Sequence, residues 1–299
     1  MDYKACRLCP RECGVDRNLR RGFCGAPGKA RIAKADLHRW EEPCICASPG
    51  SGAVFFSGCQ LQCVFCQNFE ISSRICGKAF SVEELTDLFL FLQNEKKACN
   101  LNLVSPTPYL PSIVPALEQA KARGLSIPVV FNSGGYEKIE TLEKLEGLVD
   151  IYLPDLKFCR TELSRKYAAA PDYFAVARRA IREMQRQTGK PQWENEALKS
   201  GVIVRHLVLP GESRDSLEIL NALFEDFGRD GVVLSLMSQY FPTHRAKEFP
   251  ALSRKITRLE YQKVVRHAET LGFETVYTQG FASASAAYVP DFDWKTEKE

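Results

Sequence analysis

The chain has 299 residues, 45% of them hydrophobic and 26% charged, a composition typical of globular proteins that excludes a wholly disordered chain. The uncharged stretch at residues 99–117 contains four prolines and cannot form a membrane-spanning helix. The N-terminus has no apolar run behind its basic residues, so it does not read as a secretory signal. We therefore expect a cytoplasmic protein without a membrane partner.

Cysteine is the unusual residue of this composition, because ten of the twelve cysteines fall within the first 76 residues. In a reducing compartment, cysteines clustered in this way are metal ligands more often than disulfides. The net charge of +3 is also uneven, since residues 1–40 hold ten Lys and Arg against four Asp and Glu. Arginines next to several thiolates offset the negative charge of a metal site. This segment lacks the alternation of basic and aromatic residues typical of nucleic-acid surfaces, so we expect no nucleic-acid partner.

The chain divides by pattern into a cysteine-rich metal-binding module over residues 1–48, a larger domain over 49–280 and a tail over 281–299. From Ala53 onward, short apolar runs alternate with amphipathic stretches, which predicts repeated βα units around a parallel sheet. Six strands are predicted at residues 53–57, 101–105, 127–132, 149–153, 202–209 and 231–237, with a seventh apolar run at 274–278. Capping boxes at Ser81/Glu84 and Thr257/Glu260 predict two helix starts, and Gly272 predicts a helix end.

Three cysteines, Cys59, Cys63 and Cys66, follow the first predicted strand with the spacing C-x3-C-x2-C. Three thiolates this close can bind three irons of a four-iron cluster and leave the fourth iron open for a reagent. An electron-carrying cluster or a structural zinc would use four cysteines. The alternative interpretation is therefore zinc, with Cys76 or an earlier cysteine as the fourth ligand.

With the aromatic Phe65 before its third cysteine, this motif resembles that of radical S-adenosylmethionine (SAM) enzymes. Six motifs in order, FSGCQLQCVFCQN, NLVSPTPY, FNSGGYE, DIYLPDLK, VRHLVLPG and SRKITRLEY, are similar to the pyruvate formate-lyase activating enzyme-like subgroup that carries a cysteine-rich N-terminal segment. The resemblance implies an α/β fold, a partial (βα)6 TIM-type barrel. It also implies that Cys59, Cys63 and Cys66 bind a [4Fe-4S] cluster, at which SAM is cleaved reductively to a 5′-deoxyadenosyl radical that abstracts hydrogen. A flavodoxin- or ferredoxin-type protein would donate the electron.

The same resemblance places the residues that bind the cofactor at the carboxyl ends of the strands. They are Phe65, Asn68, Ser105, Thr107, Asn132, Ser133, Asp155, Lys157 and Arg205. Asp155 and Lys157 suit the ammonium and carboxylate of the methionine moiety, and Arg205 could hold a carboxylate through two hydrogen bonds.

Each of these assignments has a competing interpretation. Phe65 could be a core residue, Asp155 and Lys157 a surface ion pair, and Arg205 an outward-facing residue. Ordinary turn chemistry also explains Asn132 and Ser133.

Two further features bear on these assignments. The sequence lacks the GGE element that many radical SAM enzymes have after the second strand, and Ser105 and Thr107 stand there instead. His206 should face away from Arg205, because side chains alternate along a strand.

The N-terminal module offers a second metal site, because Cys6, Cys9, Cys13 and Cys24 supply four thiolates within a short segment. Four ligands make a closed site, which fits either a structural zinc or a second iron-sulfur cluster. The other cysteines, Cys44, Cys46, Cys76, Cys99 and Cys159, are predicted to be buried thiols.

The leading functional prediction is a radical SAM enzyme that activates a glycyl-radical enzyme. The first alternative is radical modification of a peptide, an RNA or a small metabolite. A prediction of another class is a non-enzymatic zinc or iron-sulfur protein that binds nucleic acid through its basic N-terminal segment.

Overall fold

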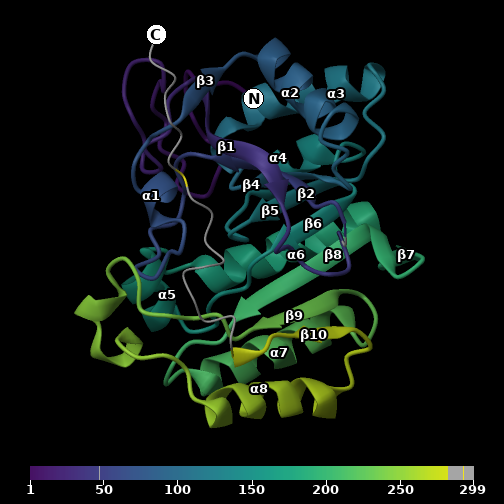
Figure 1. Cartoon of the computed structure of the whole chain (residues 1–299). Helices are drawn as coiled ribbons and strands as arrows, with labels where there is room; N and C mark the ends of the chain where they lie inside the picture. The colour runs from purple at the N-terminus through teal and green to yellow at the C-terminus, as the bar shows by residue number, and fades with distance from the viewer. Residues whose placement is uncertain (47, 282–291, 293–299) are drawn as a thin grey trace.

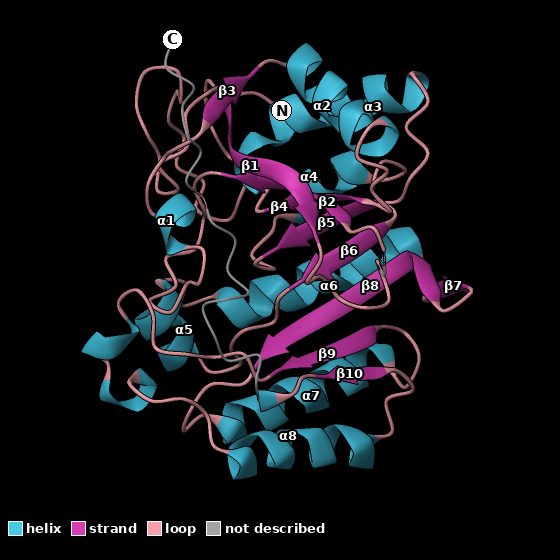
Figure 2. Ribbon diagram, viewed as in Figure 1, coloured by secondary structure: helices cyan, strands magenta, loops and turns pink. Residues whose placement is uncertain are grey.

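The computed structural model describes residues 1–46, 48–281 and 292. Within these residues, strands join in one sheet in the order β10-β9-β8-β6-β5-β4-β2-β1-β3, and β7 pairs with β8 (Figure 2). None of the described helices is long and apolar enough to cross a membrane. The sheet curves around an interior that helices enclose from outside (Figure 1).

Seven strands run parallel and form the barrel-like part of the sheet. They are β2 (Ser51–Phe56), β4 (Leu101–Val104), β5 (Val129–Ser133), β6 (Ile151–Pro154), β8 (Ala197–Leu207), β9 (Val233–Met237) and β10 (Val276–Thr278). Strands β2, β4, β5, β6 and β9 are buried along their whole length, as expected for parallel strands covered on both faces. The predicted α/β fold with a parallel sheet is confirmed, including the seventh apolar run.

Helices connect these strands and cover the outer face of the sheet (Figure 1). The longer ones are α2 (Val82–Asn94), α3 (Leu110–Ala122), α6 (Tyr173–Thr188), α7 (Ser213–Phe227) and α8 (Arg258–Leu271). Shorter ones are α1 (Phe69–Ser72), α4 (Ile139–Leu142) and α5 (Thr161–Ala168), with 3-10 turns at Thr107–Tyr109, Glu143–Leu145, Ala246–Glu248 and Pro250–Leu252. Both predicted capping boxes are formed, and Gly272 ends α8 in the left-handed conformation.

Three strands were not predicted from the sequence. β1 (Ala30–His38) pairs antiparallel with β2, β3 (Lys78–Phe80) pairs with β1, and β7 (Gln192–Glu194) forms a hairpin with β8. In β1 only three residues are buried, so no clean alternation of apolar and polar residues marks it as a strand. Residues 30–38 of the N-terminal module therefore extend the barrel sheet. The domain boundary at residue 48 stays a prediction.

The segment after β1, residues 39–46, crosses the amino ends of the parallel strands. The Cys44 carbonyl accepts the Leu198 N–H at 2.7 Å, and the Ile45 carbonyl accepts the Asn100 side-chain amide at 2.9 Å. Cys44 and Ile45 pack with interior residues of β5, β6, β8 and β9 to form an apolar floor. Cys46 and Cys99 are joined in a disulfide, so their prediction as buried thiols is wrong. They lie 53 residues apart in sequence, and only the crossing of this segment brings them together.

Candidate functional site

Cys59, Cys63 and Cys66 lie in the loop that links β2 to α1. The Ile71 carbonyl accepts the Gly58 N–H at 2.7 Å, and this fixes the start of the loop. Leu61 N–H donates to the Cys59 Sγ at 3.4 Å and Ser72 Oγ to the Cys66 Sγ at 3.3 Å. Burial raises the pKa of the Cys63 thiol to about 12, against the opposing charge of Lys157. A metal bound here must therefore displace protons from the thiols.

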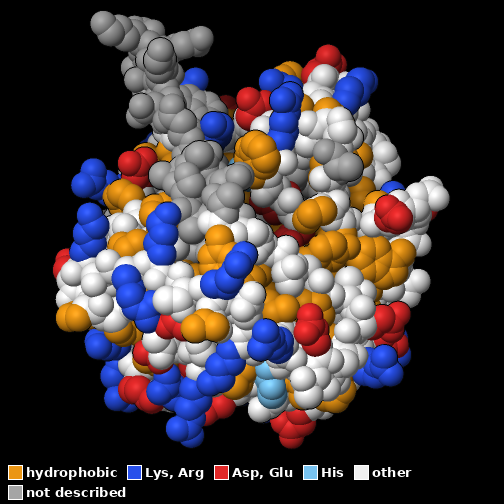
Figure 3. Space-filling view, turned by 60° about the horizontal axis from the view of Figure 1, so that its bottom comes forward, with side chains coloured by type: hydrophobic (Ala, Val, Ile, Leu, Met, Phe, Trp, Pro, Cys, Tyr) orange, Lys and Arg blue, Asp and Glu red, His pale blue; other side chains and the backbone are white. Residues whose placement is uncertain are grey.

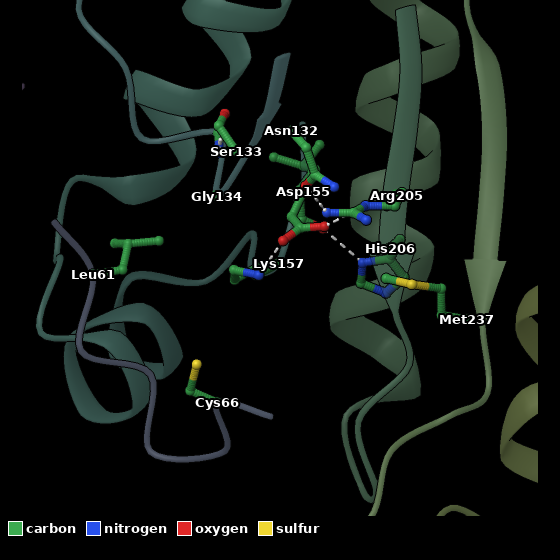
Figure 4. A network of polar contacts seen from close by, with 12 residues as sticks. Leu61, Cys66, Asn132, Ser133, Gly134, Asp155, Lys157, Arg205, His206 and Met237 are labelled. Atoms are coloured by element: carbon green, nitrogen blue, oxygen red, sulfur yellow. Dashed lines mark hydrogen bonds and ion pairs between the residues drawn. The ribbon is translucent and has the colours of Figure 1, made fainter. Parts of the chain in front are cut away.

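Asp155, at the carboxyl end of β6, lies between two cations (Figure 4). Its Oδ1 accepts the Arg205 Nε at 2.9 Å, and its Oδ2 pairs with the Lys157 ammonium. Burial would raise the pKa of Asp155, but Arg205 and Lys157 together hold it below its usual value. The side chains are only 14–17% exposed, so this is a buried ion-pair network and not a surface pair. We call Asp155, Lys157 and Arg205 the charged triad.

The charged triad adjoins the three-cysteine loop. The Lys157 ammonium lowers the pKa of each of the three cysteines, against the stronger effect of burial. Gly134, which follows β5, lies between the three-cysteine loop and the charged triad. A Cβ added there would lie 2.8 Å from Leu61 of the loop and 3.9 Å from Lys157 of the triad. The carboxyl ends of β2, β5, β6 and β8 thus bring thiols and paired charges to one place.

A cavity of about 600 Å³ occupies the barrel interior beside this place. Asn68, Asn132 and Arg205 line this cavity, together with Glu41 and Glu42 of the segment that crosses the amino ends of the strands. Arg205 thus faces inward, and its Nη2 also donates to the Asn132 Oδ1 at 2.7 Å. In Figure 3, acidic side chains lie recessed between apolar ones near the centre of the face shown.

Glu41 and Glu42 were not singled out from the sequence, because only the crossing of residues 39–46 brings them into the barrel. Burial raises the pKa of Glu41 to about 7 and also raises that of Glu42, although Arg205 opposes both shifts. Ser235 Oγ donates to Glu42 at 2.9 Å. Among the described residues, neither carboxylate has a Lys or Arg within ion-pair distance. The interior is therefore acidic and incompletely neutralised.

The sequence pattern of the Radical SAM superfamily matches residues 53–223, which includes the three-cysteine loop and the charged triad. The chain belongs to the radical SAM superfamily. It is also 31% identical over 287 residues to the uncharacterized protein MJ0674 of Methanocaldococcus jannaschii, covering 92% of this chain and 77% of that protein.

Solved structures show the same fold at low sequence identity. SuiB of Streptococcus suis, bound to its precursor peptide SuiA, matches 74% of this chain with 13% identity and a TM-score of 0.52. This radical SAM protein spans about half of SuiB, since the match covers 46% of that chain. A domain of pyruvate-formate lyase-activating enzyme from Bacteroides vulgatus matches 57% of this chain and 92% of that one, with 11% identity. Its TM-score of 0.42 is too low to place this protein in the activating-enzyme subgroup.

Membership of the radical SAM family implies a [4Fe-4S] cluster and SAM, and the three-cysteine loop fits the cluster. A single zinc ion would hold its sulfur ligands about 3.8 Å apart, given a Zn–S bond of about 2.3 Å. In the described chain, only Cys159, Asp215 and Glu218 form a group of three whose ligand atoms all lie within 4.8 Å of one another. The sulfurs of Cys59, Cys63 and Cys66 thus lie too far apart to bind one zinc ion together.

The remaining residues predicted to bind the cofactor lie around the same strand ends. Phe65 packs edge-on against Phe158 and Tyr240 in the core, with ring centroids 6.0 and 6.1 Å away. Ser105 adopts a positive φ of 56°, and its N–H donates to the Asn132 carbonyl at 2.9 Å. Ser133 Oγ accepts the Gly135 N–H at 3.2 Å. The roles of these residues toward SAM stay predictions.

His206 has the orientation predicted from strand alternation. It is buried on the opposite face of β8 from Arg205, where its ring contacts the Leu156 carbonyl at 2.7 Å and the Ser216 hydroxyl at 2.8 Å.

Glu137, in the FNSGGYE motif, is a buried carboxylate that was not among the site residues predicted from the sequence. Its Oε1 accepts Gln60 Nε2 at 2.9 Å and Thr107 Oγ1 at 3.0 Å, so it occupies the hydroxyl predicted to contact the cofactor. Its Oε2 has no hydrogen-bond partner among the described residues. The sequence offered one signal for Glu137, because it is an acidic residue that ends a motif directly after a strand. Its carboxylate contacts Gln60 of the three-cysteine loop and Thr107, which lies in the segment where the GGE element is missing.

Replacing Glu137 by glutamine should make the stability of the fold less dependent on pH. Burial raises the pKa of Glu137 to about 8, whereas its ordinary value is 4.5. As the pH rises through this range, the unfolded chain loses a proton that the folded chain keeps, so the wild type loses stability. At about pH 8 we expect Glu137→Gln to be more stable than wild type by roughly 2 kcal/mol or more, with little difference near pH 5. Urea unfolding at both pH values measures this, and parallel pH profiles for the two proteins would contradict it.

Proposed function

We propose that this protein is a radical SAM enzyme whose Cys59, Cys63 and Cys66 bind a [4Fe-4S] cluster with one open iron. The observation that carries the proposal is the three-cysteine loop beside the charged triad, at the carboxyl ends of the barrel strands. When bound, the cluster supplies one electron to SAM, whose sulfur–C5′ bond breaks to give methionine and a hydrogen-abstracting 5′-deoxyadenosyl radical. A low-potential flavodoxin- or ferredoxin-type protein would provide this electron.

The charged triad would hold the methionine end of SAM by exchanging partners. In the structure Arg205 and Lys157 neutralise Asp155, and Arg205 also binds the Asn132 amide oxygen. The cofactor's carboxylate would replace these acceptors at a cation, while its ammonium would bind Asp155. Asn68, Asn132, Ser133, Ser105 and Thr107 are the nearby polar groups proposed to contact the rest of the cofactor.

SAM binding at the open iron can be tested without knowing the substrate. The protein is reconstituted anaerobically with iron and sulfide, reduced with dithionite and examined by electron paramagnetic resonance (EPR). We expect SAM to change the spectrum of the reduced cluster, because its ligands alter the coordination of the open iron. A spectrum that is the same with and without saturating SAM would contradict the proposal.

Activation of a glycyl-radical enzyme is the first proposed reaction, supported by the six sequence motifs similar to the activating-enzyme subgroup. In this reaction the 5′-deoxyadenosyl radical takes hydrogen from a glycine of the partner protein. The test incubates the reduced protein and SAM with a glycyl-radical enzyme and looks for the EPR signal of a glycyl radical. The same incubation without SAM is the control.

The second candidate is a small cationic substrate, and the acidic cavity favours it. Glu41 and Glu42 line the cavity, and neither has a Lys or Arg within ion-pair distance among the described residues. A buried carboxylate without a counter-ion is costly, so a cationic ligand would be stabilised here.

Substitution of Glu41 and Glu42 separates this candidate from the first. Deuterated lysine, leucine and glutamate are offered as probes, and deuterium transfer into 5′-deoxyadenosine is measured by mass spectrometry. We expect deuterium transfer from lysine, the cationic probe, and none from leucine or glutamate. In the Glu41→Gln/Glu42→Gln variant the transfer from lysine should fall at least about tenfold, which is the effect of losing one charge contact. Equal transfer from all probes, or an unaffected double variant, would exclude a cation site in the cavity.

A further inference from the structure

The four N-terminal cysteines, Cys6, Cys9, Cys13 and Cys24, converge on one place. Loop hydrogen bonds hold them there: Cys6 N–H donates to the Val15 carbonyl at 3.0 Å and Phe23 N–H to the Cys13 Sγ at 3.4 Å. All four are free thiols. Burial raises the pKa of Cys9 to about 12, and the neighbouring Glu137, Cys24 and Cys13 add to the rise. Cys24 in turn lies near enough to Cys6 and Cys13 for their charges to raise its pKa.

Arg17 lies against this group and has no described counter-ion. It is 2% exposed, and its guanidinium donates to the carbonyls of Ala26 at 3.0 Å, Pro27 at 2.7 Å and Pro108. The Cys6 Sγ lies 3.8 Å from its Nη1, and no carboxylate of the described chain lies within ion-pair distance. The rings of Tyr3 and Tyr109 also face the guanidinium, but neither they nor the carbonyls neutralise its charge, and a buried cation without a counter-ion is costly. Thiolates bound to a metal beside Arg17 would supply the negative charge that balances it.

The spacing of the four sulfurs does not fit a single ion. In the described chain, no three of these cysteines have sulfurs all within 4.8 Å of one another, whereas a tetrahedral zinc site would hold them about 3.8 Å apart. The Cys59, Cys63 and Cys66 sulfurs, which the family assigns to a four-iron cluster, likewise form no group this close in the described chain. The N-terminal sulfurs thus lie too far apart to bind one zinc ion together.

We propose that Cys6, Cys9, Cys13 and Cys24 bind a second iron-sulfur cluster, closed by four thiolates, whose negative charge balances the buried Arg17. The site depends on no step of SAM chemistry. It lies beside the three-cysteine loop, since a Cβ on Gly58 would be 2.8 Å from the Cys24 carbonyl oxygen. Arg11 joins the two loops, because its Nε donates to the Gln60 carbonyl at 3.0 Å and its Nη1 to that of Ala169 at 2.6 Å. In Figure 1 the N-terminal loops, drawn in purple, run alongside β3 and α1.

Metal content of variants tests the second cluster separately from the proposed function. The full chain is reconstituted anaerobically with iron and sulfide, with zinc measured in parallel. We expect about eight irons per wild-type chain and about four in the Cys59→Ala/Cys63→Ala/Cys66→Ala variant, which cannot bind SAM at a cluster. That variant should keep an EPR signal after reduction, and SAM should not change it. Cys9→Ser/Cys13→Ser should lose the other half of the iron, and the matched control Cys159→Ala should lose none.

Two results would overturn the second cluster: a triple variant that binds about one zinc and no iron, or one that binds no metal while circular dichroism shows it folded. If wild type holds about eight irons but does not cleave SAM, the second cluster stands and the proposed function fails.

The role of Arg17 has its own readout in the triple-variant background. Arg17→Met removes a buried positive charge near the cluster, so we expect the reduction potential of the remaining cluster to fall. An unchanged potential in a variant that still binds iron would show that Arg17 is not its counter-ion.

Discussion

The Cys63→Ala variant should form 5′-deoxyadenosine at no more than the background rate in the presence of SAM and dithionite. Cys63 is the middle one of the three proposed cluster ligands, and two thiolates cannot hold a cluster in place of three. The loss should exceed the roughly 100-fold typical of removing a residue that merely orients a metal ligand. The measurement is the rate of 5′-deoxyadenosine formation by liquid chromatography and mass spectrometry.

Two controls make the Cys63→Ala result interpretable. Cys159→Ala removes a partly buried thiol outside both cysteine groups, and it should retain the wild-type rate. Iron analysis of Cys63→Ala should still show the iron of the N-terminal site. A variant that is folded, lacks the iron of the first cluster and nevertheless cleaves SAM at the wild-type rate would contradict the assignment of Cys63.

The Asp155→Asn variant should lose both stability and SAM affinity. Asp155 is the single carboxylate between Arg205 and Lys157, so an amide leaves two buried cations without a counter-ion. Breaking a buried pair in this way costs about 3 kcal/mol or more of the free energy of unfolding. SAM affinity should also fall, because the carboxylate proposed to bind its ammonium is gone. Urea unfolding and isothermal titration with SAM measure the two effects.

Asp230→Asn is the matched control for Asp155→Asn. Asp230 pairs with Lys190 at the surface, where the two side chains are 45% and 63% exposed. Solvent screens such a pair, so its loss should change the free energy of unfolding by less than about 1 kcal/mol and leave SAM binding intact. If the two variants lose equally little stability, the charged triad is not the buried network described here.

Local features of the fold and the site could be predicted from the sequence. The strands β2, β4, β5, β6 and β9 are short and mainly apolar because helices bury their outer face and the barrel interior buries their inner face. Runs of this kind are visible without tertiary information. The three cysteines lie within eight residues of one another, so their spacing predicted a metal site, with zinc as the alternative to a cluster. Strand alternation was enough to place His206 opposite Arg205.

Features that depend on chain segments meeting in space could not be predicted. β1 belongs to the sheet through its pairing with β2, although charged residues interrupt its apolar pattern. The disulfide of Cys46 with Cys99, and the entry of Glu41 and Glu42 into the barrel, both follow from the path of residues 39–46. Arg17 resembles any other arginine of a basic segment until its burial is seen.

Cleavage of SAM at a cluster held by Cys59, Cys63 and Cys66 can be measured without any substrate. The anaerobically reconstituted protein is incubated with SAM and dithionite, and 5′-deoxyadenosine and methionine are quantified over time. We expect both products to accumulate in equal amounts, and we expect no formation of either when dithionite is omitted. Intact SAM after prolonged incubation with a protein that carries its full iron content would contradict cleavage at this cluster.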